Sequence, residues 1–183
     1  LKDHGKSYNS YYEKEHSFGF KWHHENFGSN YRLTEIQSSI GRIQLKKIKN
    51  WTKKRNENAL EIIKTLKKFP KIIFVPEPSK KYTHAYYRLY AYLKINGLAK
   101  NWTRNKIIKE LNAEQIPCFS GSCPEIYLEE AFIKNNLSPK KRLPNAKILG
   151  ETSLCFLVHP TIIKKDMNFL INNLNAVLTK ASR

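Results

Sequence analysis

A helix start that carries its own cap is the feature that most constrains how this chain can fold. In the run Gly28–Gln37, Thr34 is a favourable N-cap residue and Gln37 follows three positions later, which is the spacing of a capping box. Apolar residues then recur at helical spacing until Phe69-Pro70: Ile36, Ile40, Ile43, Ile48 and Trp51, then Ala59, Ile62, Ile63 and Leu66. The sequence predicts one long helix, or a kinked pair of helices, over residues 34–69.

The loop before this helix carries the best candidates for chemistry. Gly28 permits unusual backbone angles and Asn30 tolerates them, so the loop can present Asn30 and Arg32 at the mouth of the helix. Donors at the N-terminus of a helix can serve a phosphate. The same spacing also fits a capped helix that binds nothing, and both interpretations stay open on the residues alone.

Helical and strand-like segments alternate through the rest of the chain. Residues 1–33 show little periodicity and are expected to be irregular. Strands are predicted at Ile72–Val75, Tyr86–Leu93, Ile116–Phe119 and Leu154–Val158. Helices are predicted after the cap at Thr103, at Glu125–Phe132, at Leu143–Thr152 and near the C-terminus from Met167 to Leu178. The interleaving predicts an α/β fold of the α+β kind, a small sheet with packed helices.

The composition suggests a globular protein with a strongly basic surface. Of 183 residues 40% are hydrophobic, and the net charge is +18. Such a charge attracts nucleic acid or anionic substrates. The lysines are dispersed along the chain, however, and no nucleic-acid-binding motif is present, which favours a solvated surface. A basic nucleic-acid-binding module stays as an alternative, as does a purely structural dimerisation module.

The remaining compositional signals exclude several classes. No apolar run reaches the roughly 20 residues of a membrane span. The three cysteines form no C-x-x-C pair, so no metal site is expected, and reduced thiols in the cytoplasm are expected.

Several motifs, taken in order, resemble one family. The run Gly28–Gln37, followed by Ile40-Gly41 and Gln44-Leu45, resembles the G-x-N-Y-R-[ML]-T-E-[IL]-Q segment of the DegT/StrS-type sugar-nucleotide aminotransferases. Leu1–Gly5 resembles their L-R-D-H-G segment, with Lys2 in place of Arg. Further resemblances, in chain order, are Trp51–Ala59, His84–Tyr87, Cys118–Tyr127 and Glu151–Pro160, with Val158 in place of the usual Pro.

The resemblance implies the C-terminal part of a fold-type-I chain, similar to aspartate aminotransferase. Residues 1–33 would end the large cofactor-binding domain, 34–69 would form the interdomain helix, and 70–183 would form the small C-terminal domain. The family's catalytic lysine lies upstream of the segment that Leu1–Gly5 resembles. No catalytic residue is therefore expected in this chain, and the chain alone is expected to be inactive.

The complete enzyme is expected to use pyridoxal 5'-phosphate. By resemblance it would transfer an amino group from glutamate to a keto-sugar nucleotide, in surface polysaccharide or amino-sugar biosynthesis. A homodimer without a membrane or nucleic-acid partner is expected. A His in place of the catalytic lysine would instead indicate a dehydratase.

The resemblance also implies roles for individual residues. Asn30 would reach the cofactor phosphate in the partner subunit. The substrate contacts would come from Arg32, His84, Tyr86, Ser120 and Ser122. For His84, a hydrogen-bonded structural role fits the sequence equally well.

Overall fold

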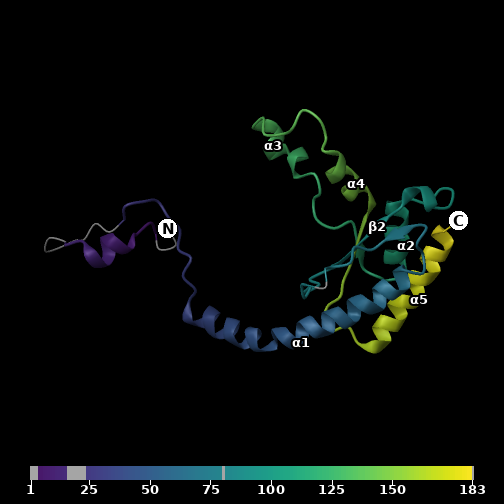
Figure 1. Ribbon diagram of the computed structural model, residues 1–183, viewed down its shortest axis with the longest axis horizontal. Coiled ribbons are helices and arrows are strands. Elements are labelled where there is room, and N and C mark those ends of the chain that lie inside the picture. The colour runs from purple at the N-terminus through teal and green to yellow at the C-terminus, as the bar shows by residue number, and fades with distance from the viewer. Residues whose placement is uncertain (1–3, 16–23, 80, 183) are drawn as a thin grey trace. The chain divides into compact units, whose positions relative to one another are not determined.

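A computed structural model describes residues 4–15, 24–79 and 81–182 (Figure 1). The chain divides into two compact units, Leu1–Ile48 and Lys49–Arg183, and each is described by itself. Helix α1 (Glu35–Leu66) contributes residues to both units and is a single uninterrupted helix of 32 residues. Of the two predicted alternatives, the long helix is therefore correct.

The predicted capping box is present at the start of α1. The backbone N–H of Thr34 donates to Oε1 of Gln37 over 3.0 Å, and the N–H of Gln37 donates to Oγ1 of Thr34 over 3.3 Å. Two N–H groups that the first helical turn leaves unpaired are thus satisfied.

The rest of the N-terminal unit is irregular in its described part, as the sequence predicted. It contains one π-helical turn, η1 (Asn9–Glu13), and an isolated antiparallel bridge between Lys6 and His24. Gly5 adopts φ +91°, and a Cβ there would lie 1.6 Å from the carbonyl oxygen of Asn26, so only glycine fits. The first three residues of the Leu1–Gly5 motif lie outside the described residues.

The C-terminal unit is built on a four-stranded antiparallel sheet. Its strands are β1 (Ile73–Phe74), β2 (Leu89–Leu93), β3 (Cys118–Phe119) and β4 (Ser153–Phe156), in the order β1-β2-β4-β3. In the central pair, β2 and β4, Leu89 lies opposite Phe156 and Tyr92 lies opposite Ser153. Strand β2 alternates between buried and half-buried residues, as expected of a strand with one face on the core.

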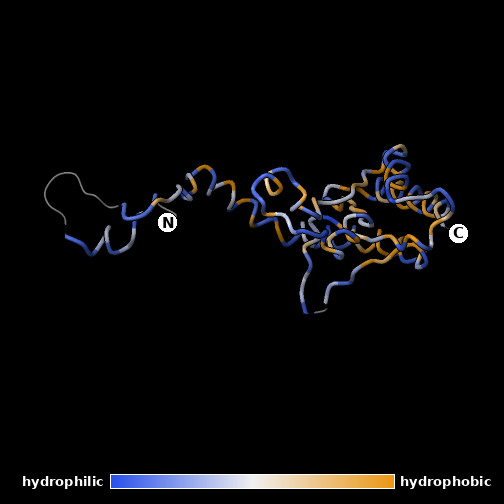
Figure 2. Tube along the Cα trace, turned by 90° about the horizontal axis from the view of Figure 1, so that it is seen from above, coloured by the Kyte–Doolittle hydropathy of each residue, from blue (hydrophilic) through white to orange (hydrophobic). Residues whose placement is uncertain are grey.

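Three helices supply the other side of the core. They are the last turns of α1, helix α2 (Arg104–Ala113) and helix α5 (Lys164–Ala181). At the start of α2, the side-chain oxygen of the N-cap Thr103 accepts a hydrogen bond from the N–H of Lys106 over 3.2 Å. The fully buried core side chains include Ile62, Leu66, Leu89, Ile107, Leu111, Leu154, Phe156, Leu174 and Leu178. Figure 2 shows hydrophobic segments throughout this unit. The predicted fold class, a small sheet with packed helices, is confirmed.

Two predicted elements differ in the structure. Strand β2 begins at Leu89 rather than Tyr86, because Tyr86 has φ +42°, which is incompatible with an extended strand. The single helix predicted at Glu125–Phe132 is instead a 3₁₀ turn, η3 (Ile126–Leu128), followed by α3 (Glu130–Lys134). Between them Glu129 is extended, with ψ 143°, which interrupts the helix.

The other short elements lie close to their predicted positions. A 3₁₀ turn, η2 (Ile95–Gly97), follows the predicted strand at β2. Helix α4 (Pro144–Thr152) begins on a proline, which suits the first helical position because its missing N–H would be unpaired there anyway.

An ion pair between the buried carboxylate of Glu125 and the partly exposed Arg142 holds the segment that contains η3, α3 and α4. Nε and Nη2 of Arg142 donate to the two carboxylate oxygens of Glu125, and the hydroxyl of Tyr127 donates to Glu125 Oε1 over 2.5 Å. The Tyr127 hydroxyl also accepts the N–H of Leu143 over 3.0 Å. Hydrogen bonds from Arg142 and then Tyr127 lower the pKa of Glu125 from its ordinary 4.5 to about 2.

This pKa shift predicts a stability that depends on pH. A carboxyl group with a lowered folded pKa contributes stability above its unfolded pKa and loses it as the pH falls toward its folded pKa. Glu125→Gln should therefore lower the free energy of unfolding at pH 7. It should also flatten the decline of that free energy between pH 4.5 and pH 2, the two values that bound the shift. Denaturant unfolding of the complete protein across this pH range measures both effects.

The matched control is Glu130→Gln, because Glu130 forms an ion pair with Lys134 on an exposed surface, where such pairs contribute little. Equal pH profiles for Glu125→Gln and the wild type would show that the Glu125–Arg142 pair does not stabilise the folded state.

Candidate functional site

Two asparagines of α1 fix two loops of the C-terminal unit. The Nδ2 group of Asn56 donates to the carbonyl oxygen of His84 over 2.8 Å, and that of Asn58 donates to the carbonyl oxygen of His159 over 2.9 Å. Asn58 is buried, with 3% of its surface exposed. Because both donors come from one helix turn, the loops at His84 and His159 are positioned against the same stretch of α1.

The predicted substrate contact Tyr86 lies in the core. Its side chain is buried, and its ring lies 4.2 Å from the ring of His84 between centroids. The N–H of Tyr86 donates to Nδ1 of His84 over 3.0 Å. Burial, and then the charge of Glu77, raises the pKa of the Tyr86 phenol. The structure thus brings His84 and Tyr86 together, and their predicted role in substrate binding stays a prediction.

The exposed ring beside them is Tyr87, which is not among the predicted substrate contacts. The guanidinium carbons of Arg55 and Arg88 each lie 5.7 Å from the centroid of the Tyr87 ring, and that of Arg88 also lies 5.8 Å from the Phe119 ring. These four residues, Arg55, Tyr87, Arg88 and Phe119, form what we call the arginine–aromatic row. Each contact has cation–π geometry.

A signal for this row was present in the composition. Only seven of the 33 basic residues are arginine. Arginine differs from lysine in presenting a planar fork that stacks on rings and pairs with oxyanions. In a lysine-rich chain, the positions of arginine could therefore have been singled out.

One hollow adjoins the row on the sheet side. It has a volume of about 510 Å³, and we call it the Ser120 hollow. Its lining is cationic and amide-rich: Arg88, Arg104, Asn105, Ile108, Lys109, Asn112, Cys118, Phe119, Ser120 and Gly121. Three cations around one space suit a ligand that carries negative charge, and the exposed Asn105 amide suits hydroxyl groups. The Asn112 amide is instead bonded to the backbone of Ile108 and Cys118.

The loop that carries the two predicted serines is held by neighbours on the sheet. The Ser120 carbonyl accepts from Oγ of Ser153 over 2.6 Å, and Oγ of Ser122 lies 3.3 Å from the Tyr90 hydroxyl. Gly121 has φ +90°, and a Cβ there would lie 2.6 Å from the Tyr90 ring, so glycine lets the loop cross that ring. Ser120 therefore lines the hollow, whereas Ser122 faces Tyr90.

The cysteines give no support to nucleophilic catalysis. Cys118, Cys123 and Cys155 are all free. Burial is the main reason that the pKa of Cys118 is raised to about 12, so this residue is a neutral thiol at neutral pH.

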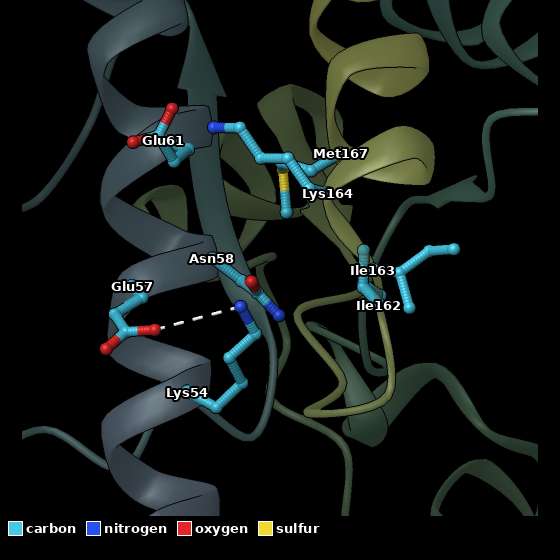
Figure 3. Close-up of a pocket in the computed structure, with 8 residues that line it drawn as sticks. All are labelled: Lys54, Glu57, Asn58, Glu61, Ile162, Ile163, Lys164 and Met167. Atoms are coloured by element: carbon cyan, nitrogen blue, oxygen red, sulfur yellow. Dashed lines mark ion pairs between the residues drawn. The ribbon is translucent and has the colours of Figure 1, made fainter.

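A second hollow lies between α1 and the start of α5 (Figure 3). Its volume is about 270 Å³, and Figure 3 shows Asn58 of α1 and Met167 of α5 directed into it. Its charged lining residues are two glutamates and two lysines: Glu57, Glu61, Lys54 and Lys164. Because Nζ of Lys54 lies 3.7 Å from Oε2 of Glu57 and the formal charges balance, this hollow offers little to a charged ligand.

The two predicted residues of the N-terminal unit, Asn30 and Arg32, are exposed on the loop before α1. Oδ1 of Asn30 accepts the N–H of Arg32 over 3.1 Å, which is an Asx turn. The turn uses the oxygen of the Asn30 amide, so the amide N–H groups are the part suited to donate to a phosphate. These residues belong to a different unit from the other predicted site residues.

No group of three or more His, Cys, Asp or Glu side chains that could hold a metal ion occurs among the described residues. In the same part of the chain, no helix has both the length and the apolar character needed to cross a bilayer.

Comparison with known proteins shows which family the chain belongs to. The model of the DegT/DnrJ/EryC1/StrS aminotransferase family matches residues 1–175. The chain is similar to an aminotransferase from Psychrobacter cryohalolentis, with 46% identity, a TM-score of 0.88, and coverage of 98% of this chain and 47% of that one. It is also 27% identical to the uncharacterized protein MJ1066 of Methanocaldococcus jannaschii, over 98% of this chain and 46% of that protein.

A more distant match shows the fold alone. The GDP-4-keto-6-deoxy-D-mannose-3-dehydratase of E. coli, solved with bound hydrated PLP, is 20% identical with a TM-score of 0.65, covering 92% of this chain and 40% of that one.

The chain therefore belongs to the DegT/DnrJ/EryC1/StrS aminotransferase family, as its motifs predicted. Its fold matches part of the fold-type-I aminotransferases of that family, which depend on pyridoxal 5'-phosphate. The chain spans about half the length of the proteins it matches.

The anchoring of the His159 loop leads to a prediction. Asn58→Ala should lower the free energy of unfolding by about 1–3 kcal/mol, because it leaves the His159 carbonyl without its buried donor. Denaturant unfolding of the complete protein measures the change. The control is Asn173→Ala, which removes an amide bonded to the Phe169 carbonyl of its own helix at an exposed surface. Equal losses in the two variants would contradict an anchoring role for Asn58.

Proposed function

We propose that the complete protein is a pyridoxal-phosphate-dependent aminotransferase that transfers an amino group from glutamate to a keto-sugar nucleotide. The observation that carries this proposal is the similarity to the Psychrobacter aminotransferase over nearly the whole chain, at 46% identity. The motifs from Gly28 to Pro160, which occur in the family's order, support it as well.

The chemistry of the Ser120 hollow supports a nucleotide-linked substrate. Arg88, Arg104 and Lys109 supply positive charge for a diphosphate, and Ser120 and Asn105 supply groups that pair with sugar hydroxyls. The E. coli relative acts, by its name, on a keto-sugar attached to GDP. We assign the Ser120 hollow to the charged part of such a substrate.

The cofactor phosphate would be held in part by Asn30. When bound, pyridoxal phosphate supplies the aldehyde that carries the amino group between the two substrates. The exposed Asn30 amide fits the phosphate as a hydrogen-bond donor. We propose that Asn30 serves the site of the partner subunit in a homodimer, and that the enzyme works in the cytoplasm in amino-sugar or surface polysaccharide synthesis.

Turnover by the complete protein tests the proposed reaction. Incubation with glutamate and 4-keto or 3-keto nucleotide sugars should yield 2-oxoglutarate and an amino sugar, both detectable by mass spectrometry. This chain alone, tested in parallel, should give no product. Turnover of ordinary amino acids without any keto-sugar acceptor, or loss of a sugar hydroxyl without amination, would overturn the proposal.

Substitution of Asn30 tests the cofactor contact. Asn30→Ala in the complete protein should weaken retention of pyridoxal phosphate by about 1–3 kcal/mol, the contribution of one charge-assisted hydrogen bond. The fold should persist, because Thr34 and Gln37 still cap α1. Equilibrium dialysis of the cofactor and circular dichroism measure the two effects.

Complementation tests whether the contact crosses the dimer interface. An Asn30→Ala chain mixed with a chain that lacks the catalytic lysine should restore one working site in each mixed dimer. That site combines the intact lysine of one chain with the intact Asn30 of the other. Mixed dimers that form and recover no activity would show that Asn30 does not act across the interface.

A further inference from the structure

A third hollow adjoins the arginine–aromatic row at Arg55. It has a volume of about 370 Å³, which falls within the roughly 300–1,000 Å³ typical of small-molecule sites. Its lining comes from α1 and from the loop after β4: Asn50, Trp51, Lys54, Arg55, His159, Pro160 and Thr161. We call it the His159 hollow. It shares Lys54 with the hollow of Figure 3 and no residue with the Ser120 hollow.

Arg55 lines this hollow and carries an unsatisfied donor. Its Nε atom is buried and has no hydrogen-bond partner among the described residues. A buried N–H of a charged group costs free energy when it is left unpaired, so native structures rarely keep one without a reason. The guanidinium is also held in place by its contact with the Tyr87 ring, which limits its freedom to turn toward water.

His159 presents a second donor. The N–H of Thr161 donates to Nδ1 of His159 over 3.3 Å, and the Thr161 hydroxyl lies 2.7 Å from the same nitrogen. Because Nδ1 accepts a hydrogen bond from the backbone, the neutral ring carries its proton on Nε2. Nε2–H is therefore a donor in either charge state of the ring. The His159 loop is fixed in turn by Asn58.

The charge of this hollow is not balanced from within. Its lining contains Lys54 and Arg55 and no carboxylate. Glu57, which lines the neighbouring hollow, forms an ion pair with Lys54. The positive charge of this hollow that no lining carboxylate neutralises is then that of the Arg55 guanidinium. Trp51 and Pro160 add an aromatic and an apolar wall.

We propose that the His159 hollow is a binding site for an organic oxyanion. The ligand is a small molecule in which a carboxylate or phosphate group, bound by Arg55 and His159, adjoins a flat apolar part that contacts Trp51 and Pro160. Planar oxyanions match the arginine fork, and flat apolar groups match an indole face. This site is separate from the Ser120 hollow that we assign to the substrate.

Three probes separate the contributions to binding. Benzoate and phenyl phosphate each carry an oxyanion on an aromatic ring, and benzamide carries the ring without charge. Titrations use the complete protein loaded with pyridoxal phosphate and follow tryptophan fluorescence and heat of binding. Benzoate, phenyl phosphate or both should bind, and benzamide should bind at least about tenfold more weakly, because charged hydrogen bonds contribute more than 1.4 kcal/mol. The preference between the two anions identifies the ligand as a carboxylate or a phosphate.

Matched variants locate the site. Arg55→Gln should weaken binding of the preferred anion at least about tenfold, whereas Lys53→Gln, an exposed residue of the same helix, should change it by about twofold or less. Trp51→Phe should abolish the fluorescence response while the heat of binding persists. If thermal denaturation shows that Arg55→Gln is unfolded, His159→Ala replaces it and should also weaken binding.

Equal binding of benzamide and the anions, or no binding of any probe, would overturn the proposal. So would unchanged affinity in the Arg55 or His159 variant, or a fluorescence response that survives Trp51→Phe. None of these outcomes depends on turnover, so the proposed aminotransferase activity is tested independently.

Discussion

The burial of the last turns of α1 is the constraint on which the rest of the C-terminal unit depends. Ala59, Ile62 and Leu66 are completely buried in the core that α2, α5 and the sheet share. Burial of a large aliphatic side chain stabilises the folded state by about 1.5–3 kcal/mol. Several such residues on one helical face fix both the rotation and the position of α1 within this unit. Earlier residues on the same helix, such as Ile36 and Ile40, are exposed and contribute nothing to this core.

Once the rotation of α1 is fixed, the polar side chains one to two turns earlier have little freedom. Asn56 and Asn58 then meet the carbonyl groups of two loops that lie far away in sequence, and Arg55 meets the Tyr87 ring. The loops at His84 and His159 have no regular structure of their own, so these bonds determine where they lie. One helix thus links the hydrophobic core to the loops at His84 and His159.

The three hollows differ in whether arginines line them. Arg88 and Arg104 line the Ser120 hollow, and Arg55 lines the His159 hollow, while the hollow between α1 and α5 has lysines balanced by glutamates. Arg55 and Arg88 contact the same ring, Tyr87, although the His159 and Ser120 hollows have no lining residue in common. Arg142 has a structural role instead, because both of its bonds go to a buried carboxylate. A net charge of +18 says little about function until these specific positions are separated from the dispersed lysines.

The sequence by itself determined the elements whose causes are local. The capping box of Thr34 and Gln37, the cap at Thr103 and the helical spacing of the apolar residues act within a few residues, and the structure has all of them. The ordered motifs likewise sufficed to identify the family. Features that depend on contacts between residues far apart in the sequence could not be predicted from it. The start of β2 is set by the positive φ of Tyr86, which follows the His84 loop that Asn56 of α1 holds. The helix is interrupted at Glu129, four residues after Glu125, whose carboxylate binds Arg142. Only the tertiary structure placed Tyr86 inside and Tyr87 outside, because burial depends on which chain segments meet there and neighbouring tyrosines are chemically identical.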